Sequence, residues 1–164
     1  MKAPHLEKFF PNLQGSRYEV KSPCDSEYNC IAWAANNTRW WFEPSRSRSK
    51  YWPAGLPRGE GEYTLANYAS VFTKCGYKRC RSPRHEPLYE KVALYVDQYG
   101  IPSHAARMNA EGIWLSKIGE CEDIEHDSLE ALEGPDEAYG YVKLILKRRL
   151  RLGVRATIKA LFRL

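Results

Sequence analysis

The segment that decides the fold reads Asp25-Ser26-Glu27-Tyr28-Asn29-Cys30-Ile31-Ala32-Trp33-Ala34-Ala35-Asn36-Asn37. Asn29 is a good N-cap residue, and capping there would place Cys30 in the first turn of a helix. A cap at Ser26 would place it about one turn deeper. The residues after Cys30 are apolar on nearly every side, which is typical of a helix that is buried all round. The segment therefore predicts a short buried helix that ends at Asn36-Asn37.

The position of Cys30 allows two interpretations. Unpaired N–H groups and the positive end of the helix dipole favour the thiolate, which would make Cys30 a nucleophile. A free cysteine is also among the most often buried residue types and frequently only packs. The choice between the two depends on whether a second catalytic group lies nearby.

Length and composition indicate one globular domain. The chain has 164 residues and a mass of 19.0 kDa, with 43% hydrophobic and 27% charged residues, which excludes a disordered or fibrous protein. We expect one domain over residues 1–150 and a separate tail over 151–164. No apolar run is long enough to cross a bilayer, and the first residues lack the apolar core of a signal peptide. We therefore expect a cytoplasmic protein, or an effector secreted by a route that leaves no such mark.

The cysteines form an odd set, namely Cys24, Cys30, Cys75, Cys80 and Cys121. No two of them have the two-residue spacing of a zinc knuckle or a redox pair. We expect reduced thiols, no metal and no cofactor, although Cys75, Cys80 and His85 could assemble a zinc site without motif spacing.

The formal charge of +5 is unevenly spread. Ten acidic residues and one base lie between Glu111 and Glu137, whereas every charged residue from Lys143 onward is basic. Residues 151–164 place apolar and basic side chains on two helical stripes, which predicts a basic amphipathic tail. The tail could bind nucleic acid, an acidic partner or a membrane, or it could pack against the domain.

The pattern along the chain predicts an α+β domain. Residues 1–22 read as an irregular arm, and residues 39–63 as a long loop whose aromatic side chains could line a groove or join the core. A helix is predicted over 65–74 and a short one over 128–132. Short β-type runs separated by turn residues predict a mainly antiparallel sheet of four to five strands. These runs are 77–80, 91–96, 104–108, 113–118 and 139–146.

His104 opens one of these strands, and side-chain alternation gives it a neighbour. His104, Ala106 and Met108 share a face, so matching it to the apolar face of the next strand places Ser116 beside His104. A histidine with a polar partner can act as a general base, or it can be a satisfied structural residue. Asp123 is an alternative partner for His104, and His126 is expected to be structural.

The segment Asn29-Cys30 before a buried helix, followed by His104-Ala105-Ala106, Gly112 and Ser116, resembles the papain-like core of NlpC-type cell-wall peptidases and amidases. The resemblance implies an N-terminal helix on an antiparallel sheet, with Cys30 as nucleophile, His104 as base and Ser116 in the third position. This family would have His, Asn, Gln or Asp there, which keeps Asp123 as a rival. The segment Tyr28-Asn29-Cys30-Ile31-Ala32-Trp33-Ala34 also resembles a motif of bacterial proteins of unassigned activity.

Three hypotheses of function follow. The first is a thiol hydrolase or acyltransferase that acts on an amide or isopeptide bond of a peptide or protein. Its oxyanion donors would include the side chain of Asn29 or Tyr28, and its groove would be lined by Trp40, Trp41 and Trp52. The second is a non-enzymatic interaction module whose basic tail binds nucleic acid or an acidic partner. The third is a bacterial toxin or effector deamidase with the same Cys-His chemistry.

Overall fold

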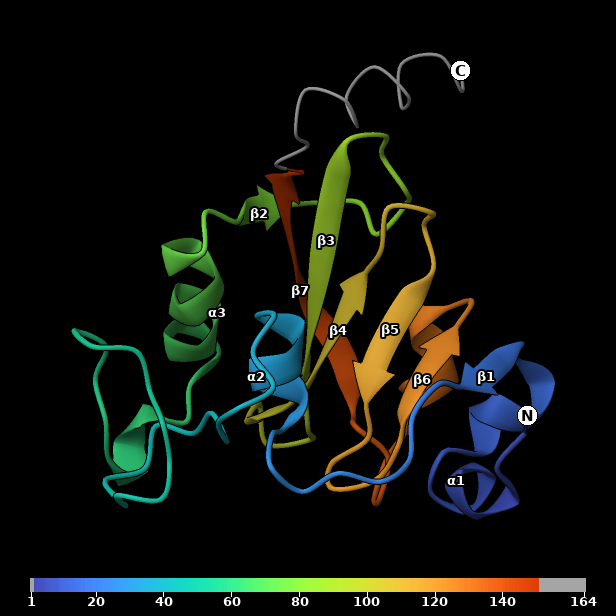
Figure 1. The fold of residues 1–164 in the computed structure, drawn as a ribbon, viewed down its shortest axis with the longest axis horizontal. Helices are drawn as coiled ribbons and strands as arrows, with labels where there is room; N and C mark the ends of the chain where they lie inside the picture. The colour runs from blue at the N-terminus through green and yellow to red at the C-terminus, as the bar shows by residue number, and fades with distance from the viewer. Residues whose placement is uncertain (1, 151–164) are drawn as a thin grey trace.

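A seven-stranded antiparallel sheet with the strand order β1-β6-β5-β4-β3-β7-β2 organises the fold (Figure 1). The computed structural model describes residues 2–150, so the predicted tail lies outside the described residues. The strands are β1 (Tyr18–Val20), β2 (Lys78–Cys80), β3 (Tyr89–Val96), β4 (Pro102–Met108), β5 (Trp114–Lys117), β6 (Asp123–His126) and β7 (Tyr141–Arg149). The α-helices are α1 (Pro4–Phe9), α2 (Cys30–Ala34) and α3 (Leu65–Lys74), and the 3-10 helices are η1 (Pro11–Gly15), η2 (Glu60–Glu62) and η3 (Leu129–Leu132).

The predicted α+β class and antiparallel sheet are confirmed, but four to five strands were too few. The two additional strands are β1, in the arm expected to be irregular, and β6, in an acidic segment without an apolar run. Neither strand has a strong sequence pattern of its own. Strand β6 is stabilised instead by pairing with β5 on one side and with β1 on the other. Tertiary pairing therefore overrides weak local preference here.

Helices α2 and α3 cover one face of the sheet, which we call the front face (Figure 1). Ile31 and Ala32 of α2 and Phe72 of α3 are buried in the front core. The sheet contributes Val92, Leu94, Ala105, Leu144 and Leu146 to this core. Helix α2 is apolar all round because it lies between the sheet and the aromatic side chains that follow it in the chain.

The N-terminal arm and η3 cover the other face, which we call the rear face. Leu6, Phe10 and Leu13 of the arm pack with Leu129 and Leu132 of η3. The sheet side chains beneath them include Ala93, Tyr95, Ala106, Met108, Trp114, Ile118, Ile124 and Ile145. Successive strand residues point to opposite faces, so neighbours such as Ala105 and Ala106 belong to different cores.

Asn29 fixes both the start of α2 and the loop that follows this helix. Its Oδ1 accepts the N–H of Ala32 at 3.1 Å, which is the predicted N-cap bond. The same oxygen accepts the N–H of Phe42 at 3.1 Å, and Nδ2 donates to the carbonyl of Phe42 at 2.8 Å. One buried amide therefore joins the helix to the loop thirteen residues later.

Within residues 2–150 the longest helix is α3, with ten residues, and none has the length and hydrophobicity needed to span a bilayer.

Replacing Asn29 separates its two roles. Asn29→Ala should lower the free energy of unfolding by about 2–3 kcal/mol, because three hydrogen bonds of about 1 kcal/mol each are lost. Asn29→Ser should recover about 1 kcal/mol, because serine caps a helix but is too short to reach Phe42. Chemical denaturation measures both values. Equal stability of the two variants would contradict the capping role.

Candidate functional site

Cys30 lies on the front face at the start of α2, as predicted, but its thiol is sealed into the core. The residue is 7% exposed and packs among the front-core side chains. Backbone groups of Ala105 and Ile31 approach the sulfur, yet burial dominates and raises the pKa of the Cys30 thiol to about 11. Cys30 is therefore a protonated thiol at neutral pH and lacks the thiolate that nucleophilic attack requires.

His104 is fully buried and lies on the rear face, opposite the face that carries the predicted nucleophile Cys30. The imidazole stacks on Tyr139, with ring centroids 4.0 Å apart and planes 3° from parallel. The next residue, Ala105, belongs to the front core with Cys30. Because strand side chains alternate, the sheet itself separates the His104 ring from the Cys30 thiol. The sequence pattern gave no information on which face of the sheet α2 would cover.

The expected contact between His104 and Ser116 is confirmed, and it continues to a second histidine. Nε2 of His104 lies 2.9 Å from Oγ of Ser116, which lies 2.8 Å from Nε2 of His126. Nδ1 of His126 lies 2.7 Å from the carbonyl of Ser128 and must donate to it. The Ser116 hydroxyl therefore donates to His126 and accepts from His104.

Burial keeps both rings of this chain neutral. It lowers the pKa of His126 to about 4 and the pKa of His104 well below its usual value. Nδ1 of His104 is left buried without a hydrogen-bond partner among the described residues. The three side chains thus cross-link β4, β5 and β6 in the rear core, and the structural role expected for His126 agrees with its contacts.

Asp123 lies on the front face, whereas His104 lies on the rear face, so Asp123 does not orient His104. This corrects the prediction that Asp123 is the alternative partner of His104. The Tyr28 hydroxyl donates to Oδ2 of Asp123 at 3.1 Å. Asp123 is paired across the strands with Lys117, whose Nζ lies 5.3 Å from the centre of the Tyr28 ring. Burial and the Asp123 carboxylate raise the pKa of Tyr28 to about 12.

The side chains expected as oxyanion donors, Asn29 and Tyr28, form hydrogen bonds with other groups of the domain. The Nδ2 group of Asn29 is bound to the carbonyl of Phe42, and the Tyr28 hydroxyl is bound to Asp123.

The three tryptophans expected in a groove have different environments. Trp52 is 3% exposed and its indole N–H lies 3.4 Å from Oδ1 of Asn67, so it is a core residue. Trp41 is partly buried, with Nζ of Lys50 4.4 Å from its ring centre. Trp40 is 52% exposed and stacks on exposed Tyr51, with ring centroids 6.3 Å apart. Of the three, only Trp40 offers an open face.

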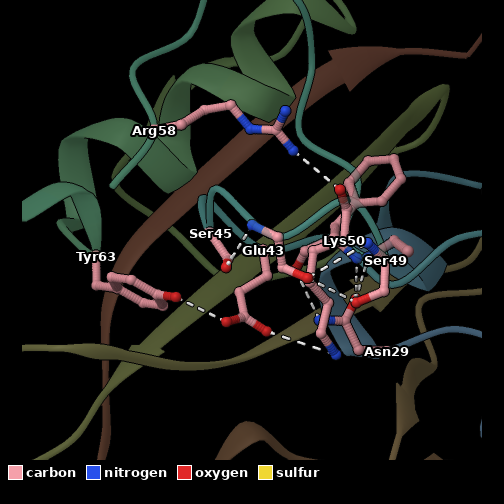
Figure 2. A network of polar contacts seen from close by, with 10 residues as sticks. Asn29, Glu43, Ser45, Ser49, Lys50, Arg58 and Tyr63 are labelled. Carbon is pink, nitrogen blue, oxygen red and sulfur yellow. Dashed lines mark hydrogen bonds and ion pairs between the residues drawn. The ribbon is translucent and has the colours of Figure 1, made fainter. Parts of the chain in front are cut away.

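A polar network holds the loop that presents Trp40 (Figure 2). The Tyr63 hydroxyl donates to Oε1 of Glu43 at 2.7 Å, and Oε2 of Glu43 lies 3.8 Å from Nζ of Lys50. Arg58 donates to the carbonyl of Lys50 at 2.9 Å. Phe42 and Tyr51 form an isolated bridge that closes the loop. These contacts fix the conformation of the loop.

Three arginines belong to the same loop as this aromatic pair. Arg39, Arg46 and Arg48 are exposed, and none forms an ion pair with any residue of the described range 2–150. A hollow of about 440 Å³ beside them is lined by Ser45, Arg46, Ser47, Gly59, Glu60 and Tyr63. We call residues 39–51 the aromatic–basic loop. In the sequence, this surface is marked by the alternation of arginine and serine after the tryptophans.

Comparison with known proteins finds one family. A family described as a domain of unknown function (DUF7689) matches residues 19–147. This range contains β2 to β6 in full, β1 without its first residue, and β7 without its last two residues. No curated protein and no solved structure matches the chain.

The buried thiol predicts the order in which the cysteines are alkylated. Treatment of the native protein with iodoacetamide near neutral pH should modify Cys30 last, because Cys30 is both protonated and shielded. Peptide mapping over time measures the order. Modification of Cys30 ahead of Cys75 at neutral pH would restore the nucleophile hypothesis.

The two buried histidines predict acid sensitivity. Both stay neutral in the folded state and are protonated in the unfolded state, so the unfolded state binds more protons as pH falls from about 6.5 to about 4. The free energy of unfolding should fall by up to about 1.4 kcal/mol per pH unit for each histidine in this window. His126→Asn should make the slope shallower, because it removes one of the two buried imidazoles. Denaturation at several pH values measures the slope.

Proposed function

We propose that this chain, which belongs to the DUF7689 family, is a non-enzymatic binding module for single-stranded nucleic acid. The observation that carries the proposal is the exposed Trp40–Tyr51 pair on the aromatic–basic loop, whose Arg39, Arg46 and Arg48 form no ion pair within residues 2–150. Such a partner would be met in the cytoplasm, the compartment expected from the sequence.

The chemistry of the loop fits a single strand better than a duplex. Every base has a π-face that can stack on an aromatic side chain, and stacking contributes about 1–3 kcal/mol per base. Arg46 and Arg48 lie beside the aromatic pair in sequence and can contact the phosphates that join successive bases. An acidic protein would satisfy the arginines but would leave the open face of Trp40 without a planar partner.

The loop also carries more free charge than the base of the predicted tail. Nζ of Lys147 is 2.6 Å from Oε2 of Glu86, and Arg148 is bound to Glu90 and to the carbonyl of Cys75. Two of the cations that suggested a tail-based partner are thus neutralised within the domain. The loop arginines have no such acidic partner within residues 2–150.

Binding to a fluorescent single-stranded oligonucleotide tests the proposal. Trp40→Ala should weaken binding roughly 5- to 150-fold, which corresponds to the loss of about 1–3 kcal/mol of stacking. The double variant Arg46→Ala/Arg48→Ala should reduce the magnitude of the slope of log K against log salt by about 1.4, since each phosphate contact on a single strand contributes about 0.7.

Matched controls separate this loop from the rest of the surface. Tyr99→Ala removes a 79% exposed aromatic ring from the β3–β4 turn, and Arg17→Ala removes a highly exposed arginine near β1. Both should bind as well as the native chain. No affinity at low salt, or equal losses in Trp40→Ala and Tyr99→Ala, would refute the proposal. A chain that ends at Leu150 should keep the part of the affinity that depends on Trp40.

An NlpC-type, papain-like thiol hydrolase is the second candidate, and one observation favours it. Helix α2 packs its Cys30 end on β4 and β5, the strands of His104 and Ser116. The position of His104 on the rear face and the raised pKa of Cys30 oppose it. The acyltransferase and deamidase versions use the same two residues and meet the same difficulty.

A further inference from the structure

Two cysteines and a glutamate from distant parts of the chain meet at the surface. Cys24 follows β1, whereas Cys121 and Glu122 form the turn between β5 and β6. The two sulfur atoms and a carboxylate oxygen all lie within 4.8 Å of one another. Nε2 of His5 lies 3.1 Å from Oε1 and 3.2 Å from Oε2 of Glu122. We call Cys24, Cys121 and Glu122 the thiol–carboxylate cluster.

Backbone hydrogen bonds hold the segments that carry the cluster. The N–H of Lys21 donates to the carbonyl of Asp123 at 2.8 Å, and the N–H of Asp123 donates to Oγ of Ser22 at 3.0 Å. Within the turn, the N–H of Ile118 donates to the carbonyl of Glu122 at 2.9 Å. The three side chains are therefore brought together by the fold, and closing them around an ion requires side-chain movement only.

We propose that the thiol–carboxylate cluster binds a zinc ion through Sγ of Cys24, Sγ of Cys121 and a carboxylate oxygen of Glu122, with water in the fourth position. Zinc takes four ligands in a tetrahedron and accepts thiolate sulfur at about 2.3 Å together with carboxylate oxygen. Two sulfur ligands select a soft cation such as zinc over calcium or magnesium. Each thiol loses its proton to solvent when the metal binds, so affinity rises with pH.

The surroundings favour a cation at this position. Asp25, Glu120 and Asp123 are close neighbours of the cluster in sequence and add negative charge. The basic groups in contact with its residues are the exposed imidazole of His5, on Glu122, and the ammonium of Lys117, which donates to the backbone carbonyl of Cys121. The contact with His5 orients the Glu122 carboxylate, as a hydrogen bond from outside the ligand set commonly does in zinc sites. Cys24 is exposed and the other two residues are half-buried, so an ion can enter from solvent.

A bound ion would join the connection between β1 and α2 to the sheet. Cys24 lies in this connection, and Cys121 and Glu122 lie in the turn between β5 and β6. Sequence spacing could not reveal the site, because its two cysteines lie nearly a hundred residues apart and form no motif.

Titration of the reduced full chain with Co²⁺ tests the proposal. Tetrahedral visible bands and a sulfur-to-cobalt charge-transfer band should appear at one equivalent and disappear when Zn²⁺ is added. Zinc should also raise the melting temperature. Cys24→Ser and Cys121→Ser should each weaken binding at least tenfold, Glu122→Gln about tenfold, and His5→Ala less than the loss of a ligand.

Cys75→Ser is the matched control, because Cys75 is also a half-buried free thiol but lies at the end of α3. Its spectrum should match that of the native chain. The proposal is overturned if the bands are absent, if they persist in Cys24→Ser, or if Cys75→Ser removes them. Glu122→Gln keeps both thiols and provides a folded comparison if a cysteine variant does not fold. The surface tested for nucleic acid is separate, so either proposal can fail alone.

Discussion

The side chain of Asn29 is the constraint on which the front of the molecule depends. One buried amide ends the preceding loop, starts α2 and holds Phe42 through donor and acceptor bonds. Because Phe42 pairs with Tyr51, the position of the exposed aromatic rings is set from inside the core. A residue adjacent to Cys30 thus sets the position of the exposed aromatic pair.

Residue types common in active sites serve here to satisfy buried polar groups on two separate faces. On the rear face, a row of hydrogen bonds joins His104, Ser116, His126 and the carbonyl of Ser128, and leaves Nδ1 of His104 without a partner within residues 2–150. On the front face, Asp123 accepts from Tyr28, and Lys117 donates to the carbonyl of Cys121 while its Nζ lies over the Tyr28 ring. Unpaired polar groups in a core are costly, so such chains need no catalytic explanation.

Local signals predicted local structure well. The cap at Asn29 located α2, and the run from Leu65 to Lys74 gave α3 with its observed bounds. Strand alternation placed Ser116 beside His104, and Gly112 takes the positive φ of the turn between their strands. These features depend on a few neighbouring residues, whose preferences are readable directly.

The layer arrangement could not be read in the same way. Alternation says that His104 and Ala105 face opposite directions, but it does not say which direction meets α2. That choice is made by the whole set of packed side chains, and it decided against the Cys30–His104 pair. Strand β6 and the thiol–carboxylate cluster were missed for a related reason, since each exists only through partners far away in the sequence.

The two outermost strands of the described sheet, β1 and β2, are only three residues long, and β2 presents Lys78 and Arg79 to solvent. A long apolar edge would offer its free N–H and carbonyl groups to another polypeptide and invite self-association. Here the hydrogen-bonding register runs out within three residues, and a second copy that approached β2 would meet charge of its own sign. The described domain can therefore keep a broad sheet while resisting polymerisation through its margins.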